Sequence, residues 1–214
     1  DILYFTCVKE SLEDLTNVEY LRDTASQSGI QTELIYIDEI GWTGDYFVDT
    51  QDRPIQSIFK LYPWEWMTNE EFGKHILSDA NEAQWIEPSW KMILSNKAIL
   101  PILWKLFPNH PNLLECYFDS PKNLLDYVKK PLLSREGANI TMFQKHVTTY
   151  ETKGDYGHEG YIYQALAELP QQATGYNIIG SWIIGQEPCG ISFRESDSPI
   201  TTDKSRFIPH IIED

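Results

Sequence analysis

The stretch KKPLLSREGAN, residues 129–139, is the part of the sequence that decides how the chain is interpreted. The apolar residues before it indicate a β-strand that ends near Pro131, because proline cannot donate to the next rung of a ladder. A lysine at the end of a strand is held in position by the sheet. A loop that contains Gly137 lets backbone N–H groups approach phosphate oxygens. Lys130 and Gly137 therefore mark a candidate phosphate site.

Two side chains of the same loop fit this chemistry. Arg135 can bind a phosphate through two parallel hydrogen bonds, and Glu136 can hold Mg²⁺ against the phosphates. The order differs from a Walker A motif, in which the glycines precede the lysine, and from the dinucleotide-binding fingerprint. On spacing alone, a plain strand–turn–strand hairpin is the better interpretation of residues 129–139.

Three other segments add candidate residues of lower specificity. Lys97 follows a Ser-Asn pair and so projects from the start of an apolar helix, where an exposed cap residue is the commoner interpretation. The apolar strand at 161–163 runs into Gln164 and small residues, a junction that offers backbone N–H and C=O groups to the edge of a purine. Residues 194–202 collect charged and hydroxyl side chains at the end of a later strand, where a solvated turn is the alternative.

The chain is acidic, but its charge is unevenly distributed. Its 214 residues carry 17 Lys+Arg against 32 Asp+Glu, a formal net charge of −15. Residues 1–90 hold 5 basic and 18 acidic side chains, whereas residues 91–214 hold 12 and 14. This acidity argues against a general binder of nucleic acid or of an anionic membrane. The cationic stretch from Lys91 to Arg135 is a candidate anion site, and the acidic first part suits either a cationic amine or a solvated surface.

The periodicity predicts an α/β portion followed by an α+β portion. Residues 2–8 read as a strand buried on both faces, 11–28 as a helix and 32–37 as a parallel second strand, which makes a β-α-β unit. The further expected elements are a strand at 58–62, helices at 68–80, 85–95 and 97–107, a helix end at 123–127, and strands at 127–132, 140–143, 160–165, 178–184 and 190–194. Pro101 is expected to mark a bend or boundary between two helices.

The three cysteines, Cys7, Cys116 and Cys189, lie far apart and show no metal-binding spacing. We therefore expect reduced, mostly buried thiols and a cytoplasmic setting. Cys189 has no base beside it, so a buried turn thiol is favoured over a nucleophile. The apolar runs are far shorter than the roughly 20 residues of a membrane span, and we expect no signal peptide.

Six blocks of sequence together carry a more specific resemblance. They are SIFKLYPWEWM (57–67), WIEPSWKMILSNKAILPILW (85–104), FPNHPNLL (107–114), YVKKPLLSREGANI (127–140), GYIYQALAELP (160–170) and ESDSPITTDKSRFIPH (195–210). In these blocks the chain resembles the C-terminal synthetase part of the glutathionylspermidine synthase family. The resemblance runs from about Phe5 to His210. It implies an α+β, glutathione synthetase-like ATP-grasp fold with an N-terminal α/β portion, and a chain that is a C-terminal fragment of the enzyme.

The resemblance also implies functional residues. Lys97 and Lys130 resemble the two lysines that bind the phosphates of ATP, Gly137 lies in the loop that covers them, and Glu136 resembles a Mg²⁺-binding glutamate. Gln164 matches the start of the linker that binds adenine. The other implied nucleotide contacts are Ala165, Leu166, Ala167, Pro199, Ile200 and Thr201.

The implied activity is that of an ATP-dependent acid–amine ligase. Such an enzyme phosphorylates a carboxylate with Mg-ATP, and an amine attacks the acyl phosphate to leave an amide, ADP and phosphate. The implied partners are a small carboxylate, such as a glutathione-like peptide, and a polyamine-like amine.

The resemblance limits what this chain alone is expected to do. In this family the arginine proposed to stabilise the transition state and most Mg²⁺ ligands precede the matched part, so we expect no catalytic residue here and turnover only in the full-length protein. Residues 1–90 are expected to form the α/β substrate-side portion and 91–214 the nucleotide-binding portion. A non-catalytic nucleotide-binding module that retains the ATP-grasp fold is the alternative.

Overall fold

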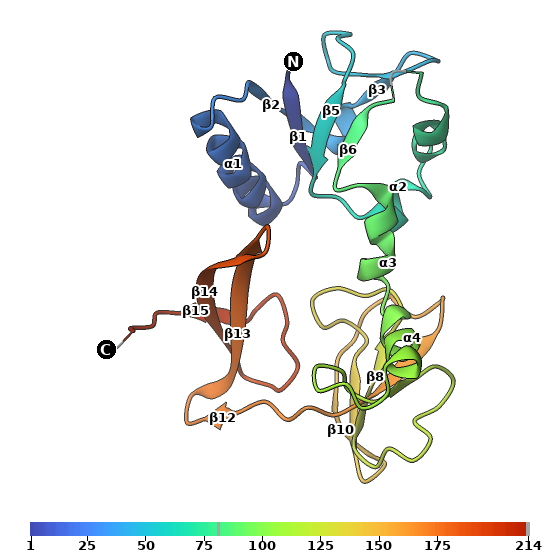
Figure 1. Cartoon of the computed structure of the whole chain (residues 1–214), viewed down its shortest axis with the longest axis vertical. Coiled ribbons are helices and arrows are strands. Elements are labelled where there is room, and N and C mark those ends of the chain that lie inside the picture. Colours follow the sequence, from blue (N-terminus) through green and yellow to red (C-terminus); the bar gives the residue numbers. More distant parts are fainter. Residues whose placement is uncertain (81, 213–214) are drawn as a thin grey trace. The chain divides into compact units, whose positions relative to one another are not determined.

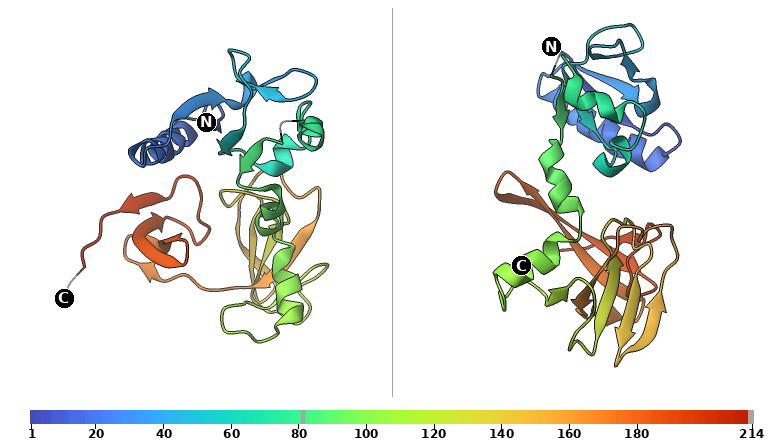
Figure 2. Two further views of the ribbon diagram at one scale, coloured as in Figure 1. Left: turned by 45° about the horizontal axis from the view of Figure 1, so that its top comes forward. Right: turned by 90° about the vertical axis from the view of Figure 1, so that its right-hand side faces the viewer.

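The computed structural model describes residues 1–80 and 82–212. The chain forms two compact units, Asp1–Ile93 and Leu94–Asp214. Figures 1 and 2 show both units, and each is described here by itself. None of the helices in the described part of the chain combines the length and the apolar character needed to cross a bilayer.

A parallel four-stranded sheet in the order β2-β1-β5-β6 forms the centre of the first unit. Its strands are β1 (Leu3–Cys7), β2 (Thr32–Tyr36), β5 (Ser57–Lys60) and β6 (Gln84–Ile86). Helix α1 (Leu12–Gln27) connects β1 to β2 and begins after Ser11, whose side chain accepts a hydrogen bond from the Asp14 N–H at 3.2 Å. The predicted β-α-β unit is therefore confirmed.

The two faces of this sheet carry separate cores, because side chains alternate along a strand. Phe5 and Cys7 of β1 pack with Val18 of α1 on one face, where Figure 1 shows the helix beside the sheet. Tyr4 faces the other core, which is rich in aromatic side chains and contains Trp64. The prediction that residues 2–8 are buried on both faces is confirmed.

The rest of the first unit consists of short elements. These are β3 (Gly41–Trp42), β4 (Phe47–Val48), α2 (Trp64–Met67), the 3₁₀ helices Ile37–Glu39, Gly73–Ser78 and Ser89–Lys91, and α3 (Met92–Ser95), which crosses into the second unit. A buried carboxylate, Asp49, closes the loop after β4. It accepts hydrogen bonds from the Tyr4 hydroxyl at 2.8 Å and from the backbone N–H groups of Gln51 and Arg53, each at 2.9 Å.

The second unit contains two antiparallel sheets and one longer helix, α4 (Ile99–Leu106). The five-stranded sheet has the order β10-β9-β8-β11-β7. Its strands are β7 (Cys116–Tyr117), β8 (Tyr127–Pro131), β9 (Thr141–Gln144), β10 (Val147–Glu151) and β11 (Tyr161–Ala165). The four-stranded sheet consists of β12 (Gln171–Gln172), β13 (Gly175–Ile184), β14 (Glu187–Ser196) and β15 (Arg206–Ile208), in that order.

The plain hairpin interpretation of residues 129–139 is correct as topology, because β8 pairs with β9 in antiparallel fashion across this loop. The candidate phosphate loop is thus the connection between two neighbouring strands. The chain then leaves the sheet at the end of β11 and reaches β12 through residues 166–170 (Figure 1).

The helices predicted at 68–80 and 123–127 are wrong, and the helical segment predicted at 85–95 is confirmed only from Ser89 to Ser95, where a 3₁₀ helix leads into α3. Residues 68–80 hold no α-helix but a 3₁₀ helix, since the chain folds back on α2 at Gly73, where a Cβ would lie 1.8 Å from the Met67 carbonyl oxygen. Trp85 belongs to β6, because pairing with β5 places it against Phe47 in the core. At 123–127 the chain forms a turn that leads into β8.

Pro101 marks neither a bend nor a boundary. It lies in the first turn of α4, where a missing backbone N–H breaks no helical hydrogen bond, and the boundary lies before it at residues 96–98. The cysteine prediction holds for Cys7 and Cys116, which are buried, but is wrong for Cys189, which is exposed on β14.

Candidate functional site

One cavity of the second unit, of about 410 Å³, brings the sequence-predicted residues together. Small-molecule sites usually measure roughly 300–1,000 Å³. The residues that line it come from the segment before α4, from β8 and its loop, from β9, from the end of β11 and the linker after it, and from the turn after β14. All of the predicted residues are among them: Lys97, Lys130, Glu136, Gly137, Gln164, Ala165, Leu166, Ala167, Pro199, Ile200 and Thr201.

Lys130 and Gln164 are in direct contact in this cavity. The Lys130 Nζ donates a hydrogen bond to the Gln164 Oε1 at 2.7 Å, from adjacent strands β8 and β11. Burial lowers the pKa of Lys130, because a desolvated ammonium group loses hydration. The Gln164 carbonyl partly replaces that hydration. Among the described residues, Gln164 is the one hydrogen-bond partner of the Lys130 ammonium group, and a partly desolvated cation held by a neutral acceptor is well suited to receive an anion.

Lys97 reaches the same cavity from the segment before α4. Its backbone N–H donates to the Leu132 carbonyl oxygen at 2.9 Å, and its Nζ donates to the Ser134 carbonyl oxygen at 2.8 Å and to the Ser134 Oγ at 2.9 Å. These bonds connect Lys97 to the loop that follows β8. The sequence places Lys97 and Ser134 far apart, and only the fold brings them together.

The loop itself approaches the turn after β14 closely at Gly137. This residue has φ +69°, and a Cβ there would lie 2.4 Å from the Thr201 carbonyl oxygen. The Gly137 carbonyl oxygen accepts a hydrogen bond from the Thr152 Oγ1 at 2.5 Å. A side chain at this position would both strain the backbone and separate the loop from the turn.

The other end of the cavity is apolar. Val128 of β8, Ile140 before β9, Met142 of β9 and Ile200 form a buried cluster, against which Leu166 packs. This surface has the character needed to cover the face of a flat ring. Sequence reasoning did not select Val128, Ile140 or Met142, although the alternation of buried residues along the two strands was the available signal.

The linker after β11 offers fewer donors than the sequence suggested. The Ala165 N–H donates to the Glu115 carbonyl oxygen at 2.8 Å, and the Leu166 N–H donates to the Asp126 carbonyl oxygen at 3.1 Å. Within the described part of the chain the Ala167 N–H makes no such bond. A ring edge that lies along this linker would therefore meet Ala167 as its backbone donor.

Glu136 is an exposed carboxylate at the rim of the cavity. Among residues 1–80 and 82–212, no group of three or more His, Cys, Asp or Glu side chains could hold a metal ion. One carboxylate fits Mg²⁺ only as the partner of phosphate oxygens and water, which is a usual arrangement for this ion. Glu136 thus fits the role of a single oxygen ligand.

The turn after β14 is held in shape by its own side chains. The Ser198 Oγ donates to the Ile200 carbonyl oxygen at 3.0 Å, and the Ser196 Oγ donates to the same oxygen at 3.3 Å. Arg206 pairs with Glu195 and Asp197, each at 2.9 Å. These contacts shape the turn whose residues Pro199, Ile200 and Thr201 line the cavity.

Comparison with known proteins places this geometry in a family. The family model described as "Glutathionylspermidine synthase preATP-grasp" matches residues 1–213. A protein of Haemophilus influenzae described as "Putative acid--amine ligase" is 45% identical over 209 residues, which cover 92% of this chain and 53% of that protein. Trypanothione synthetase of Crithidia fasciculata is 29% identical over 225 residues, 94% of this chain and 34% of that protein.

Two further similarities extend this result. The bifunctional glutathionylspermidine synthetase/amidase of Escherichia coli is 28% identical over 229 residues, 95% of this chain and 37% of that protein. The crystal structure of D-cycloserine synthetase DcsG shares the fold, with a TM-score of 0.57 and 13% identity over 99% of this chain and 76% of that one. The chain thus spans about half or less of the length of these curated relatives. It belongs to the family described as glutathionylspermidine synthase preATP-grasp.

Proposed function

We propose that this chain supplies the ATP-binding part of an acid–amine ligase with an ATP-grasp fold. The observation that carries the proposal is the single cavity that joins two lysines and a glycine loop to an apolar cluster. The lysines suit a polyphosphate, and the apolar cluster with the Ala167 N–H suits a purine. The family and its relatives, which are ligases and synthetases by name, support an enzyme that joins an acid to an amine.

The proposed reaction needs positioning and charge neutralisation more than a reactive side chain. A carboxylate oxygen of the acid attacks the γ-phosphorus of ATP, the bond to the bridging oxygen breaks, and ADP leaves. The nitrogen lone pair of the amine then attacks the acyl carbon. Phosphate leaves with the former carboxylate oxygen, and the nitrogen loses a proton to give the amide.

The residues of this chain act on the phosphate end of that reaction. Lys130 and Lys97 neutralise the phosphate oxygens, and the loop around Gly137 covers them with backbone N–H groups. Glu136 would hold Mg²⁺, which offsets the charge that develops on the leaving ADP. The acid, for which a glutathione-like peptide is the candidate, and the polyamine-like amine are substrates of the whole protein.

Two measurements test the proposal. Calorimetric titration of the 214-residue chain is expected to show ATP binding more tightly than adenosine, since the lysines contact only the phosphates. The full-length protein, screened over pairs of acids and amines, is expected to release ADP only when both are present. Equal affinities for ATP and adenosine would refute the phosphate site. Nucleotide binding without ADP release for any pair would favour the non-catalytic module instead.

A further inference from the structure

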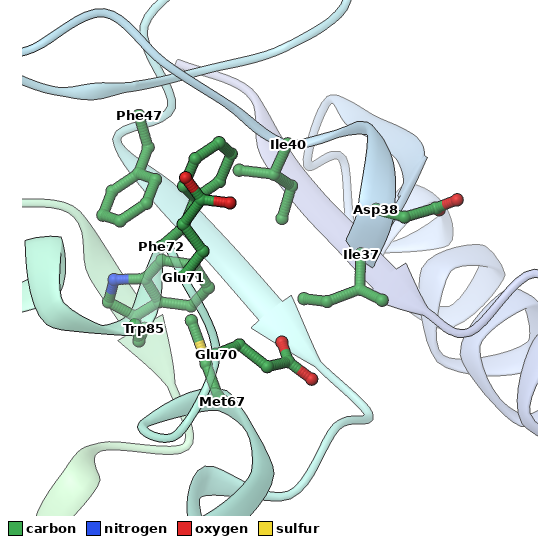
Figure 3. Close-up of a pocket in the computed structure, with 10 residues that line it drawn as sticks. Ile37, Asp38, Ile40, Phe47, Met67, Glu70, Glu71, Phe72 and Trp85 are labelled. Atoms are coloured by element: carbon green, nitrogen blue, oxygen red, sulfur yellow. The ribbon is translucent and has the colours of Figure 1, made fainter.

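A second cavity lies entirely within the first unit and belongs to no site described so far (Figure 3). It has a volume of about 200 Å³. Its walls come from the 3₁₀ helix at 37–39, from β4 and β6, and from the segment that follows α2. The apolar and aromatic side chains that line it are Ile37, Ile40, Phe47, Met67, Phe72 and Trp85.

The inner wall of this cavity is formed by buried aromatic side chains that pack against one another. Phe47 and Trp85 are 2% and 7% exposed, and their rings meet edge to face with centroids 5.4 Å apart. Met67 closes the same core at the end of α2. An apolar wall of this kind stabilises the apolar part of a bound ligand, by roughly 0.8 kcal/mol for each methylene group that is removed from water.

The opening of the cavity carries negative charge. Of the described residues that line it, three are carboxylates, Asp38, Glu70 and Glu71, and none is cationic. In Figure 3 the side chains of Glu70 and Glu71 extend toward Ile37 and Ile40, whereas Asp38 points away from the other labelled side chains. Only Glu70 and Glu71 therefore face a ligand in the cavity.

Glu70 is held in place, and Glu71 is available. The Tyr62 hydroxyl donates a hydrogen bond to the Glu70 Oε1, which fixes that carboxylate at the rim. Glu71 makes no hydrogen bond or ion pair within the described residues. Both glutamates lie in a turn that is closed by a hydrogen bond from the Gly73 N–H to the Glu70 carbonyl oxygen at 3.1 Å.

We propose that this cavity binds a primary ammonium group on an unbranched apolar chain, with the chain against Phe47, Met67 and Trp85 and the ammonium at Glu70 and Glu71. Phe72, which is 42% exposed, lies at the rim and adds an aromatic edge beside the alkyl chain of the ligand. The inference rests on the proposed function in one respect, since it identifies this ligand with the amine substrate of the ligase.

The test is calorimetric titration of the 214-residue chain, without nucleotide, with ethylamine, hexylamine and hexan-1-ol. Hexylamine is expected to bind more tightly than ethylamine, by about fourfold for each methylene that enters the cavity. It is also expected to bind at least threefold more tightly than hexan-1-ol, because exposed carboxylates contribute modestly to the binding of a cation. A hexylamine affinity no greater than that of ethylamine or of the alcohol would overturn the proposal.

Three variants separate the cavity from the general acidity of the first unit. Glu71→Gln is expected to weaken hexylamine binding two- to fivefold and to leave hexan-1-ol unchanged. Phe72→Ala is expected to weaken hexylamine and leave ethylamine unchanged. Glu10→Gln removes the same charge from an exposed position outside the cavity and is expected to change neither. An equal loss in Glu10→Gln and Glu71→Gln would show non-specific attraction and refute the site.

The amine test and the nucleotide test fail separately. If ATP binds and hexylamine does not, the ligase proposal stands and this inference is wrong. If hexylamine binds in the cavity and ATP does not bind, the amine site stands and the nucleotide site is wrong.

Discussion

Replacement of Lys130 by methionine is the sharpest test of the nucleotide site. Methionine keeps an unbranched chain of similar length on β8 and removes only the ammonium group. An ammonium group has three N–H donors, and one of them bonds to the Gln164 Oε1 at 2.7 Å. Two donors are left for phosphate oxygens. The substitution therefore removes two charge-assisted hydrogen bonds from the proposed complex.

The expected loss follows from those two bonds. A hydrogen bond to a charged group contributes about 1.5–3 kcal/mol, so the lower value for two bonds gives about 3 kcal/mol, or about a hundredfold in the Kd for ATP. Adenosine has no phosphate and is expected to bind both proteins within about twofold of one another. Isothermal titration of the 214-residue chain measures all four constants.

Lys129→Met is the matched control. Lys129 is the neighbour of Lys130 on β8 and carries the same charge, but its Nζ lies 4.1 Å from the centroid of the Tyr161 ring and it does not line the cavity. We expect less than a threefold change in ATP affinity from this variant. Equal losses in the two variants would mean that net charge, rather than the position of Lys130, governs binding, and the site assignment would then be wrong.

Three further perturbations have clear expected outcomes. Burial alone would raise the pKa of Asp49, but the hydrogen bonds that its carboxylate accepts outweigh burial and lower the pKa from an ordinary 3.8 to about 2. The ionised carboxylate therefore stabilises the fold fully above pH ~4, and this stabilisation is lost as the pH falls toward 2. Asp49→Asn is expected to lower the free energy of unfolding, measured in urea, by about 2 kcal/mol at pH 7. It is also expected to reduce the dependence of that free energy on pH between pH 2 and 4, and an unchanged pH dependence in this range would contradict the prediction. An Ala Cβ at Gly137 would lie 2.4 Å from the Thr201 carbonyl oxygen, whereas Gly185 has a similar φ of +64° and nothing within 4 Å of an added Cβ. Gly185→Ala is therefore expected to lose about 1 kcal/mol of stability and to leave ATP binding unchanged, and Gly137→Ala is expected to lose more stability and to weaken ATP binding tenfold or more. Glu136→Gln is expected to reduce the gain in ATP affinity that Mg²⁺ provides and to leave the affinity without metal unchanged or higher. ATP titrations in Mg²⁺ and in EDTA measure both quantities. The same Mg²⁺ effect in Glu136→Gln and in the unchanged protein would mean that the assignment is wrong.

The elements of the chain that local pattern predicts well are those whose burial repeats along the sequence. The β-α-β start follows from an unbroken apolar run, a stretch with apolar residues at helical spacing and a second strand, and the structure has all three. The strands at 127–131, 141–144 and 161–165 also follow, because each combines apolar alternation with a glycine or proline nearby. The helix predicted at 68–80 fails because the chain folds back at Gly73 onto the end of α2, a close approach to the Met67 carbonyl oxygen that the periodicity of apolar residues does not reveal.

The sequence by itself determined the residue types of the candidate site and, through six ordered blocks, the family to which the chain belongs. Tertiary structure decided which of those residues meet. Lys97 bonds to Ser134 and Lys130 to Gln164, over separations of 37 and 34 residues that no local spacing encodes. It also decided that the Ala165 and Leu166 N–H groups are used within the protein and that Glu70 and Glu71 border an aromatic cavity. The physical reason is the same in each case. Propensity and periodicity act between neighbours along the chain, whereas hydrogen-bond partners and cavity walls are set by which elements the burial of apolar surface brings side by side.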